Sequence, residues 1–232
     1  MSIEALKAEL ATANRILFRN GVVDAFGHVS ARHPEKPDHY LLARNMAPAN
    51  VTAEDIMVFG PDHEPVGDER RPYLERFIHG EIFRARPDVQ AVVHSHSPAV
   101  IPFGVVAGAK LRPVFHMCGF LGAGPAHFEI RDVRGPGSDL LIRDRELGEA
   151  LARSLGTAEA VLMRGHGSTV VADSVRLAVY RAIYAEVNAR LQCQAITMGG
   201  EITFLTEQEA AAAAATNKGQ LARAWDMWAS QA

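Results

Sequence analysis

Three histidines follow short apolar runs in a pattern that can bring their side chains to one point. His94 and His96 end the run Val89–His96, and His166 follows Ala160–Met163. Side chains at positions i and i+2 of a strand point to one face, so His94 and His96 can meet where their strand ends. Three nitrogen ligands with an open position are typical of a catalytic metal site, whereas structural zinc sites close with four ligands. A lone histidine is usually an ordinary core or surface residue, but a His-x-His pair at a strand end favours metal binding.

Glu75 is the acid–base candidate nearest to these histidines in the sequence. It lies in the segment Arg70–Arg76, in the expected first turn of a helix that begins at Pro72 and leads into the histidine strand. A carboxylate beside a metal can act as a ligand, as a proton shuttle, or as both in turn. A carboxylate in a first turn also stabilises the helix dipole, and from the residues alone this capping role is the more frequent one.

The elements that must position these residues alternate between helix and strand without a linker. Apolar residues at helical or alternating spacing, together with glycine, proline and capping residues, set the expected boundaries. The sequence predicts a helix at 3–20, strands at 40–42 and 56–59, a helix at 72–85, the histidine strand, a glycine-rich segment at 104–124, a helix at 146–155, a hairpin that carries His166, a helix at 174–198 and a last helix with the alanine tract 210–215, Trp225 and Trp228.

Length, charge and cysteine content restrict the class of protein. The chain has 232 residues, 48% of them hydrophobic, which predicts one domain over residues 1–232 with one substantial core. The net charge of −3 gives no electrostatic case for nucleic-acid binding. Two cysteines argue against a disulfide framework and against a cysteine-based zinc site. No basic leader with an apolar stretch and no run of ~18 apolar residues is present, so we expect a cytoplasmic protein that does not enter a membrane.

Four motifs together resemble the class II aldolase/adducin family. They are the glutamate segment 70–76, the Ala–Val–Val–His–Ser–His strand 91–96, the Arg–Gly–His–Gly turn 164–167 and the segment Asp24–Arg32, in family-like order and spacing over about residues 3–205. The resemblance implies an α/β fold of three layers, α/β/α, around a mainly antiparallel central sheet. It also implies a homotetramer with fourfold symmetry and active sites between subunits.

The same resemblance implies roles for the residues that match the family's motifs. His94, His96 and His166 are then the ligands of a divalent metal, and Glu75 is the catalytic acid/base. This match favours the catalytic interpretation of Glu75 over the capping one.

Three positions depart from the members of the family that act on sugar phosphates. Those members hold the phosphate with small polar residues, which supply backbone and hydroxyl donors. The corresponding positions here read Gly27–His28, Ala43–Pro48 and Tyr73–Leu74, so an imidazole, a guanidinium and bulky groups replace hydroxyl groups. The departures disfavour a phosphosugar aldolase or epimerase.

The replacing residues suit a planar carboxylate substrate. Guanidinium groups pair with carboxylates in a two-pronged geometry, and an aromatic side chain can line a flat, partly apolar slot. At least one arginine of the adjacent pair at 70 and 71 is expected to be only solvated. The expected substrate-binding residues are His28, Arg44, Asn45, Arg71 and Tyr73.

The segments 72–80 and 116–120 resemble a decarboxylase branch of the family, whose members act on hydroxylated aromatic or pyridine carboxylates. The implied function is a metal-dependent, non-oxidative decarboxylase in which Glu75 delivers a proton and no organic cofactor takes part. Imidazole ligands suit Mn²⁺, Zn²⁺ or Co²⁺, and only the resemblance to this branch favours Mn²⁺.

Two other functions stay open at this level. A metal-dependent aldolase that cleaves a non-phosphorylated hydroxy-keto substrate would use the same metal residues. A non-catalytic binding module, as in the adducin branch, is disfavoured because all three histidines and Glu75 are present.

Overall fold

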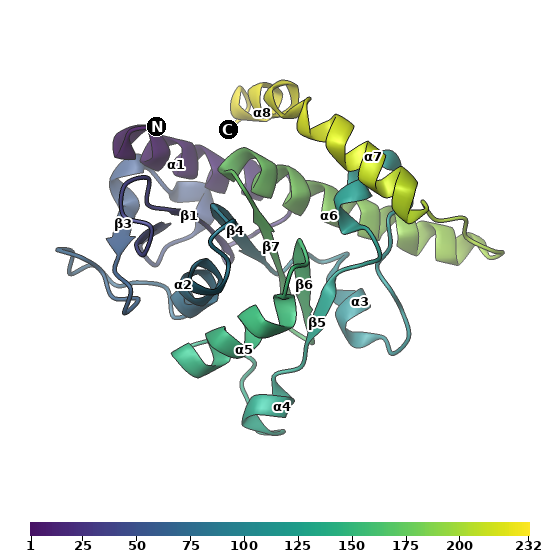
Figure 1. Cartoon of the computed structure of the whole chain (residues 1–232), viewed down its shortest axis with the longest axis horizontal. Coiled ribbons are helices and arrows are strands. Elements are labelled where there is room, and N and C mark those ends of the chain that lie inside the picture. The colour runs from purple at the N-terminus through teal and green to yellow at the C-terminus, as the bar shows by residue number, and fades with distance from the viewer.

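A seven-stranded sheet lies between two layers of helices in the computed structural model, which describes every residue from Met1 to Ala232 (Figure 1). The strand order across the sheet is β3-β2-β1-β4-β7-β6-β5. The strands are β1 (His28–Arg32), β2 (Tyr40–Ala43), β3 (Ile56–Phe59), β4 (Ala91–Ser95), β5 (Ala126–Phe128), β6 (Ala160–Met163) and β7 (Gly167–Ala172).

The sheet is mixed rather than uniformly antiparallel. All neighbouring strands up to β6 run antiparallel, whereas β5 joins the edge of the sheet parallel to β6. This corrects the expected mainly antiparallel sheet at one edge. The physical reason is the connection from β5 to β6, which crosses over through helices, as a parallel pair requires.

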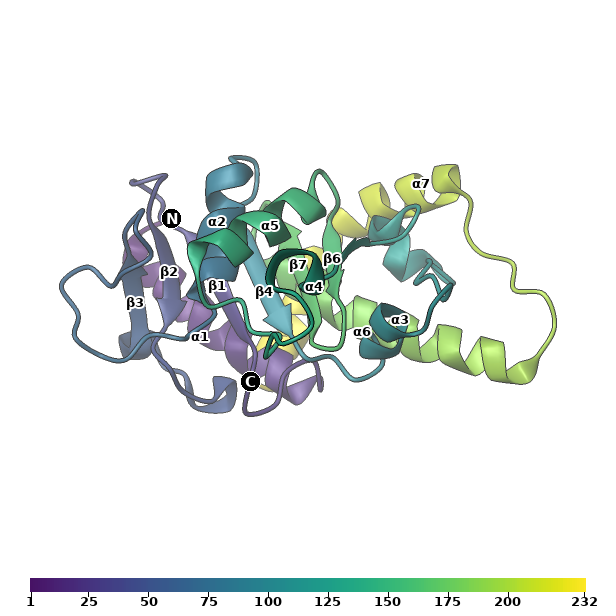
Figure 2. The ribbon, with the colours of Figure 1, turned by 90° about the horizontal axis from the view of Figure 1, so that it is seen from below.

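Helices α1 and α6 cover one face of the sheet, and α2 and α5 cover the other (Figure 1). Figure 2 shows the C-terminal end of α6 extending beyond the sheet. None of the helices combines the length and the apolar character needed to cross a bilayer. The helices are α1 (Ile3–Arg19), α2 (Arg76–Ala85), α3 (Ile101–Val105), α4 (Arg131–Arg134), α5 (Arg145–Leu155), α6 (Val175–Met198), α7 (Glu207–Lys218) and α8 (Leu221–Ala229), with short 3₁₀ turns at Pro48–Asn50, Ala53–Asp55 and His116–Leu121.

Strand β4 occupies the centre of the sheet, and all five of its residues are buried. Helices pack on both of its faces, which explains why its first three residues, Ala91–Val93, are all apolar and do not alternate with polar ones. His94 lies opposite His28 on β1 and opposite Thr169 on β7. The register of the sheet therefore fixes what surrounds this histidine.

The predicted boundary of α2 is wrong at its start. Pro72 forms a bridge with Arg44 beside the sheet instead of opening the helix, which begins at Arg76. Glu75 therefore lies at the N-cap position. The predicted C-terminal helix is also divided, because α7 ends at Lys218 and α8 begins at Leu221.

Side chains of α6 hold the segment that follows the histidine strand. The Glu186 carboxylate accepts hydrogen bonds from the Ser97 hydroxyl at 2.5 Å and from the Ala99 N–H at 2.9 Å. Further along α6, Asn188 and Gln192 bond to backbone groups of the extended segment 110–114. Asn188 and Gln192 thus take the place of a partner strand for the segment 110–114. Glu186 fixes the turn directly after His96.

Candidate metal centre

Four side chains converge where β4 ends. Three of them are His94, His96 and His166, and the fourth is Glu75 from the start of α2; we call this set the histidine cluster. The Nε2 atom of His96 lies 3.3 Å from Nε2 of His94 and 3.1 Å from Nε2 of His166. The Glu75 Oε2 atom lies 3.6 Å from His94 Nε2 and 3.4 Å from His166 Nε2. One potential ligand atom from each residue therefore lies within 4.8 Å of all the others.

These separations fit the donor set of one divalent cation. Ligand atoms bound tetrahedrally at about 2.0–2.1 Å from an ion lie about 3.3 Å from one another. The distances between the Nε2 atoms agree with that value. When all three ring nitrogens present their lone pairs to one another they repel electrostatically, and a cation at the centre removes this repulsion.

Two glycines near the cluster lie where a side chain would not fit. Gly167 follows His166, and a Cβ atom there would lie 2.1 Å from the Ser95 carbonyl oxygen. Gly27 has φ +95°, and its Cβ would lie 2.6 Å from a Val23 methyl carbon. Both glycines therefore allow strands β1 and β7 to approach β4 beside its histidines.

The His94 ring is oriented by β7. Its Nδ1 atom lies 3.4 Å from the Thr169 hydroxyl. With Nδ1–H donating to that hydroxyl, Nε2 presents its lone pair to the centre of the cluster, as metal-binding histidines usually do. The His166 ring lacks such a partner, because its Nδ1 atom is buried without a hydrogen bond.

Glu75 does not cap its helix. Its side chain makes no hydrogen bond to the N–H groups of α2, and Oε1 instead accepts the Ile142 N–H at 2.9 Å. Burial alone would raise the pKa of this carboxyl. The His166 hydrogen bond, the electrostatic attraction of the His94 and His166 rings, and the Ile142 N–H outweigh burial and lower the pKa to about 2. The group is therefore a carboxylate at neutral pH, and the capping interpretation is excluded.

Burial favours the neutral form of three histidines in this region. Burial lowers the pKa of His94 and of His28 well below the usual value, and it lowers the pKa of His96 as well. A metal ligand must present an unprotonated nitrogen, so these low values favour metal binding.

A second group of buried polar residues lies directly beside the cluster. The His28 ring centre lies 5.2 Å from that of His94, and its Nδ1 lies 2.6 Å from Nε2 of His79. The other His79 nitrogen lies 2.5 Å from the Ser30 hydroxyl. The predicted set of substrate-binding residues does not include His79 or Ser30. Two spacings point to them, because His79 is four residues after Glu75 on one helix face and Ser30 is two residues after His28 on one strand face.

The remaining expected substrate residues are Tyr73 and the arginine rim, which we define as Arg44, Asn45 and Arg71. Tyr73 contacts the cluster through His28, at 4.6 Å between ring centres, and donates its hydroxyl proton to the Met46 carbonyl at 2.6 Å. Burial raises the pKa of Tyr73 to about 12, so its hydroxyl stays protonated.

The arginines of the rim differ in what they contact. Arg44 binds Asp55 through Nε at 2.7 Å, and its two terminal amino groups have no partner in the chain. The Arg71 guanidinium is exposed and has no partner, and its carbonyl accepts the Asn45 N–H at 2.8 Å. The neighbouring Arg70 is bound to Asp68 on the surface. Arg71 is therefore the member of the adjacent pair that is free to bind an anion.

Comparison with known proteins places this geometry in a family. The sequence profile of the class II aldolase and adducin N-terminal domain matches residues 8–193. The chain belongs to the class II aldolase/adducin family.

Relatives in this family include enzymes named as decarboxylases. The decarboxylase tropJ of Talaromyces stipitatus is 38% identical over 236 residues, which cover 92% of this chain and 88% of that protein. The 3,4-dihydroxyphthalate decarboxylase of Arthrobacter keyseri is 34% identical over 217 residues, which cover 87% of this chain and 83% of that protein. An aldolase II superfamily protein from Pseudomonas syringae has a similar fold, with a TM-score of 0.80, 24% identity and coverage of 98% of this chain and 92% of that one.

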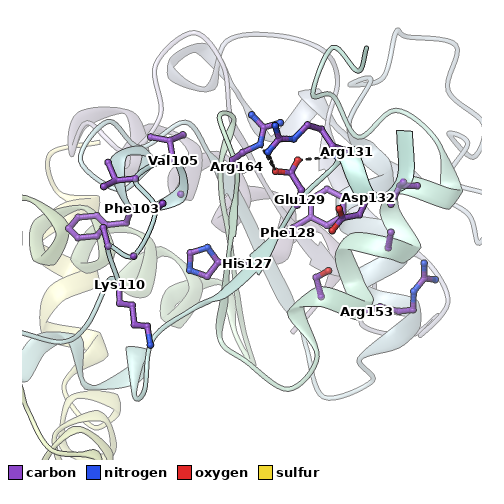
Figure 3. A pocket seen from close by; sticks show the side chains of 18 residues that line it. Phe103, Val105, Lys110, His127, Phe128, Glu129, Arg131, Asp132, Arg153 and Arg164 are labelled. Atoms are coloured by element: carbon purple, nitrogen blue, oxygen red, sulfur yellow. Dashed lines mark hydrogen bonds and ion pairs between the residues drawn. The ribbon is translucent and has the colours of Figure 1, made fainter. Parts of the chain in front are cut away.

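The largest hollow of this class II aldolase fold lies elsewhere. It has a volume of about 770 Å³, lies between the segment 103–110 and α5, and is lined by no residue of the histidine cluster. Figure 3 shows Arg131 and Arg164 directed at Glu129, with separations of 2.7 Å and 2.6 Å. Glu129 thus binds two of the arginines that line the hollow.

Proposed function

We propose that the protein is a metal-dependent, non-oxidative decarboxylase of a hydroxylated aromatic or pyridine carboxylate. The observation that carries the proposal is the convergence of three imidazoles and one carboxylate at the end of β4. Similarity to tropJ and to a 3,4-dihydroxyphthalate decarboxylase supports carboxylate loss as the reaction.

His94, His96 and His166 would hold a divalent cation, which we propose to be Mn²⁺, with Zn²⁺ and Co²⁺ as alternatives. When bound, such an ion supplies Lewis-acid stabilisation of the negative charge on substrate oxygens. Thr169 holds the His94 ring in the orientation that this role needs.

Glu75 moves the proton in the proposed reaction. Because it is ionised at neutral pH, it first accepts a proton from the ring hydroxyl of the substrate. It then delivers this proton to the ring carbon that bears the leaving carboxylate, which gives a β-keto acid. The bond to the carboxylate breaks, CO₂ leaves, and the electron pair restores the aromatic ring and its phenolate, which solvent protonates. No organic cofactor is needed.

The arginine rim would select an acidic aromatic substrate. The free amino groups of Arg44 and the exposed guanidinium of Arg71 are suited to a second carboxylate, with Asn45 beside them. The Tyr73 and His28 rings, 4.6 Å apart, provide an aromatic wall between this rim and the cluster.

We also propose that residues 1–232 act as one domain within a cytoplasmic homotetramer whose neighbouring subunits complete each site. Two large apolar side chains beside the cluster support this, since Phe26 is 66% exposed and Leu74 is 47% exposed. The Phe26 ring centre lies 6.4 Å from that of His96. Sedimentation of the purified protein measures the subunit number.

The test of the function is a substrate screen that separates the possible products. Hydroxybenzoates, hydroxyphthalates and hydroxypyridine carboxylates are incubated with Mn²⁺-loaded protein, and CO₂, aldehydes and pyruvate are measured in parallel. We expect CO₂ and the decarboxylated ring in equal amounts. Release of an aldehyde or pyruvate from hydroxy-keto acids, without CO₂ from any aromatic acid, would assign an aldolase instead.

A further inference from the structure

Three buried residues form a continuous hydrogen-bonded chain that ends at the edge of the cluster. The Ser30 hydroxyl lies 2.5 Å from His79 Nδ1, and His79 Nε2 lies 2.6 Å from His28 Nδ1. Ser30 and His79 are 0% exposed and His28 is 4% exposed. The chain uses three of the four ring nitrogens, and the fourth is Nε2 of His28.

The protons of this chain can be arranged in two ways. In the first, His28 Nδ1–H donates to His79 and His79 Nδ1–H donates to Ser30, which leaves the Ser30 hydroxyl proton without an acceptor. In the second, the Ser30 hydroxyl donates to His79 Nδ1 and His79 Nε2–H donates to His28 Nδ1, so that every buried proton is used. A buried donor without an acceptor is costly, and the second arrangement is favoured by about tenfold or more. The second arrangement puts the proton of His28 on Nε2.

The free end of the chain is open to a small molecule. His28 Nε2 has no hydrogen-bond partner within the protein. Unlike His63 Nδ1 and His166 Nδ1, which are fully buried without a partner, it is not enclosed by the protein. The His28 ring lies between His94, at 5.2 Å, and Tyr73, at 4.6 Å between ring centres. An N–H group at Nε2 is therefore next to the position where the proposed substrate binds.

We propose that Ser30 and His79 fix the tautomer of His28, and that His28 Nε2–H donates a hydrogen bond to an anionic oxygen of the substrate. The inference rests on the proposed function and specifies the substrate further. A carboxylate or phenolate oxygen beside the chelating groups is accepted. An amino group at that place is rejected, because two N–H donors would face one another. Ser30 and His79 are positioning residues, and His28 contacts the substrate.

The tautomer can be measured without any substrate. Histidine labelled with ¹⁵N in metal-free and in Zn²⁺-loaded protein reports which ring nitrogen carries the proton, and His28→Gln and His79→Gln assign the signals by their loss. We expect protonated Nε2 in both His28 and His79, and loss of the single tautomer at His79 in Ser30→Ala. A proton on His28 Nδ1 in the wild-type protein would overturn the inference.

Kinetics of two matched variants test what His28 donates. Glutamine keeps an N–H near the position of Nε2, whereas asparagine keeps an acceptor for His79 and ends too short to reach the substrate. We expect His28→Asn to raise KM at least about tenfold and His28→Gln to raise it less than about threefold, with kcat changing less than KM. Equal effects of both variants on KM would overturn the donor role. If the wild-type protein releases no CO₂, the proposed function fails while the NMR result still decides the tautomer.

Discussion

The histidine cluster and the arginine rim lie on either side of His28 and Tyr73, yet the fold holds them in different ways. The cluster is fixed by strand register, since His94 lies opposite His28 and Thr169 in the sheet. The rim lies after β2 and before α2, where one ion pair, Arg44–Asp55, and the Tyr73–Met46 hydrogen bond orient it. The paired strands hold the histidines of the cluster in a single arrangement, whereas the loop residues of the rim keep hydrogen-bond donors free for a ligand.

This difference predicts that the cluster tolerates no change and that the rim is adjustable. Loss of a cluster residue should abolish the chemistry for every substrate. Loss of a rim residue should change only which carboxylate binds. The following variants test this division, beginning with the largest expected effect.

Removing a metal ligand should have the largest effect. We expect His94→Ala, His96→Ala or His166→Ala to lower metal affinity by at least about 100-fold, because even the residues that only orient ligands contribute 10- to 100-fold. Metal analysis after dialysis measures the loss, and circular dichroism should show an intact fold. The control is His127→Ala, an exposed histidine on β5. Wild-type metal content in the triple alanine variant would refute the site.

Glu75→Gln should leave the metal and remove the proton transfer. Glutamine keeps the shape of the side chain but cannot carry a proton between oxygen and carbon. We expect kcat to fall by at least ~10²-fold with KM little changed. Glu69→Gln, an exposed carboxylate a few residues earlier, is the matched control. If Glu75→Gln also loses metal, Glu75 is a ligand as well; if turnover stays near normal, another group supplies the proton.

The adjacent arginines give a direct test of the rim. We expect Arg71→Ala to raise KM for a dicarboxylate about tenfold, the usual size of a charge-assisted hydrogen bond, and to spare kcat. Arg70→Ala should change KM less than about twofold, because Asp68 already binds that guanidinium on the surface. Steady-state kinetics with a dicarboxylate and a monocarboxylate measure both. A larger rise in KM for Arg70→Ala than for Arg71→Ala would show that Arg70, and not Arg71, binds the substrate carboxylate.

The smallest expected effect concerns how the loop before the rim is anchored. His63 has φ +67° and is 2% exposed, and its Nε2 lies 2.7 Å from Glu81 Oε1 on α2. Burial lowers the pKa of His63 although Glu81 opposes this. A histidine whose pKa is lower in the folded state binds fewer protons there, so its contribution to stability is lost as the pH falls below about 6.5.

Urea unfolding between pH 7 and pH 5 tests this anchor. We expect the wild-type free energy of unfolding to fall more steeply toward pH 5 than that of His63→Gln. His127→Gln serves as the exposed control. Equal slopes for the wild type and His63→Gln would show that the His63–Glu81 pair does not contribute to the pH dependence of stability.

The spacing of residues within one segment was enough to predict the part of the site at the end of β4. The i, i+2 rule placed His94 and His96 together, and the apolar stripe of α6 predicted that helix as Ser174–Met198, close to Val175–Met198. His166 was only a possible third member until the family motif supported it, because nothing local relates positions 96 and 166.

Contacts between distant segments could not be predicted in this way. The start of α2 was misplaced because Pro72 pairs with Arg44 across the chain. The segment 110–114 has no strand pattern, and its partners are the side chains of Asn188 and Gln192 on α6. The partner of Arg44, Asp55, is eleven residues away on a 3₁₀ turn, so the sequence did not distinguish a free guanidinium from a paired one.

Titration of Mn²⁺ into metal-free protein, with CO₂ release from a carboxyl-labelled hydroxyaromatic acid as the signal, tests the central claim most directly. The account predicts that the initial rate rises linearly with added metal, stops rising at one ion per chain, and stays at background in the His94/His96/His166 triple alanine variant. Release of CO₂ that is independent of metal, or that the triple variant retains, would contradict the assignment of the histidine cluster as the catalytic metal centre.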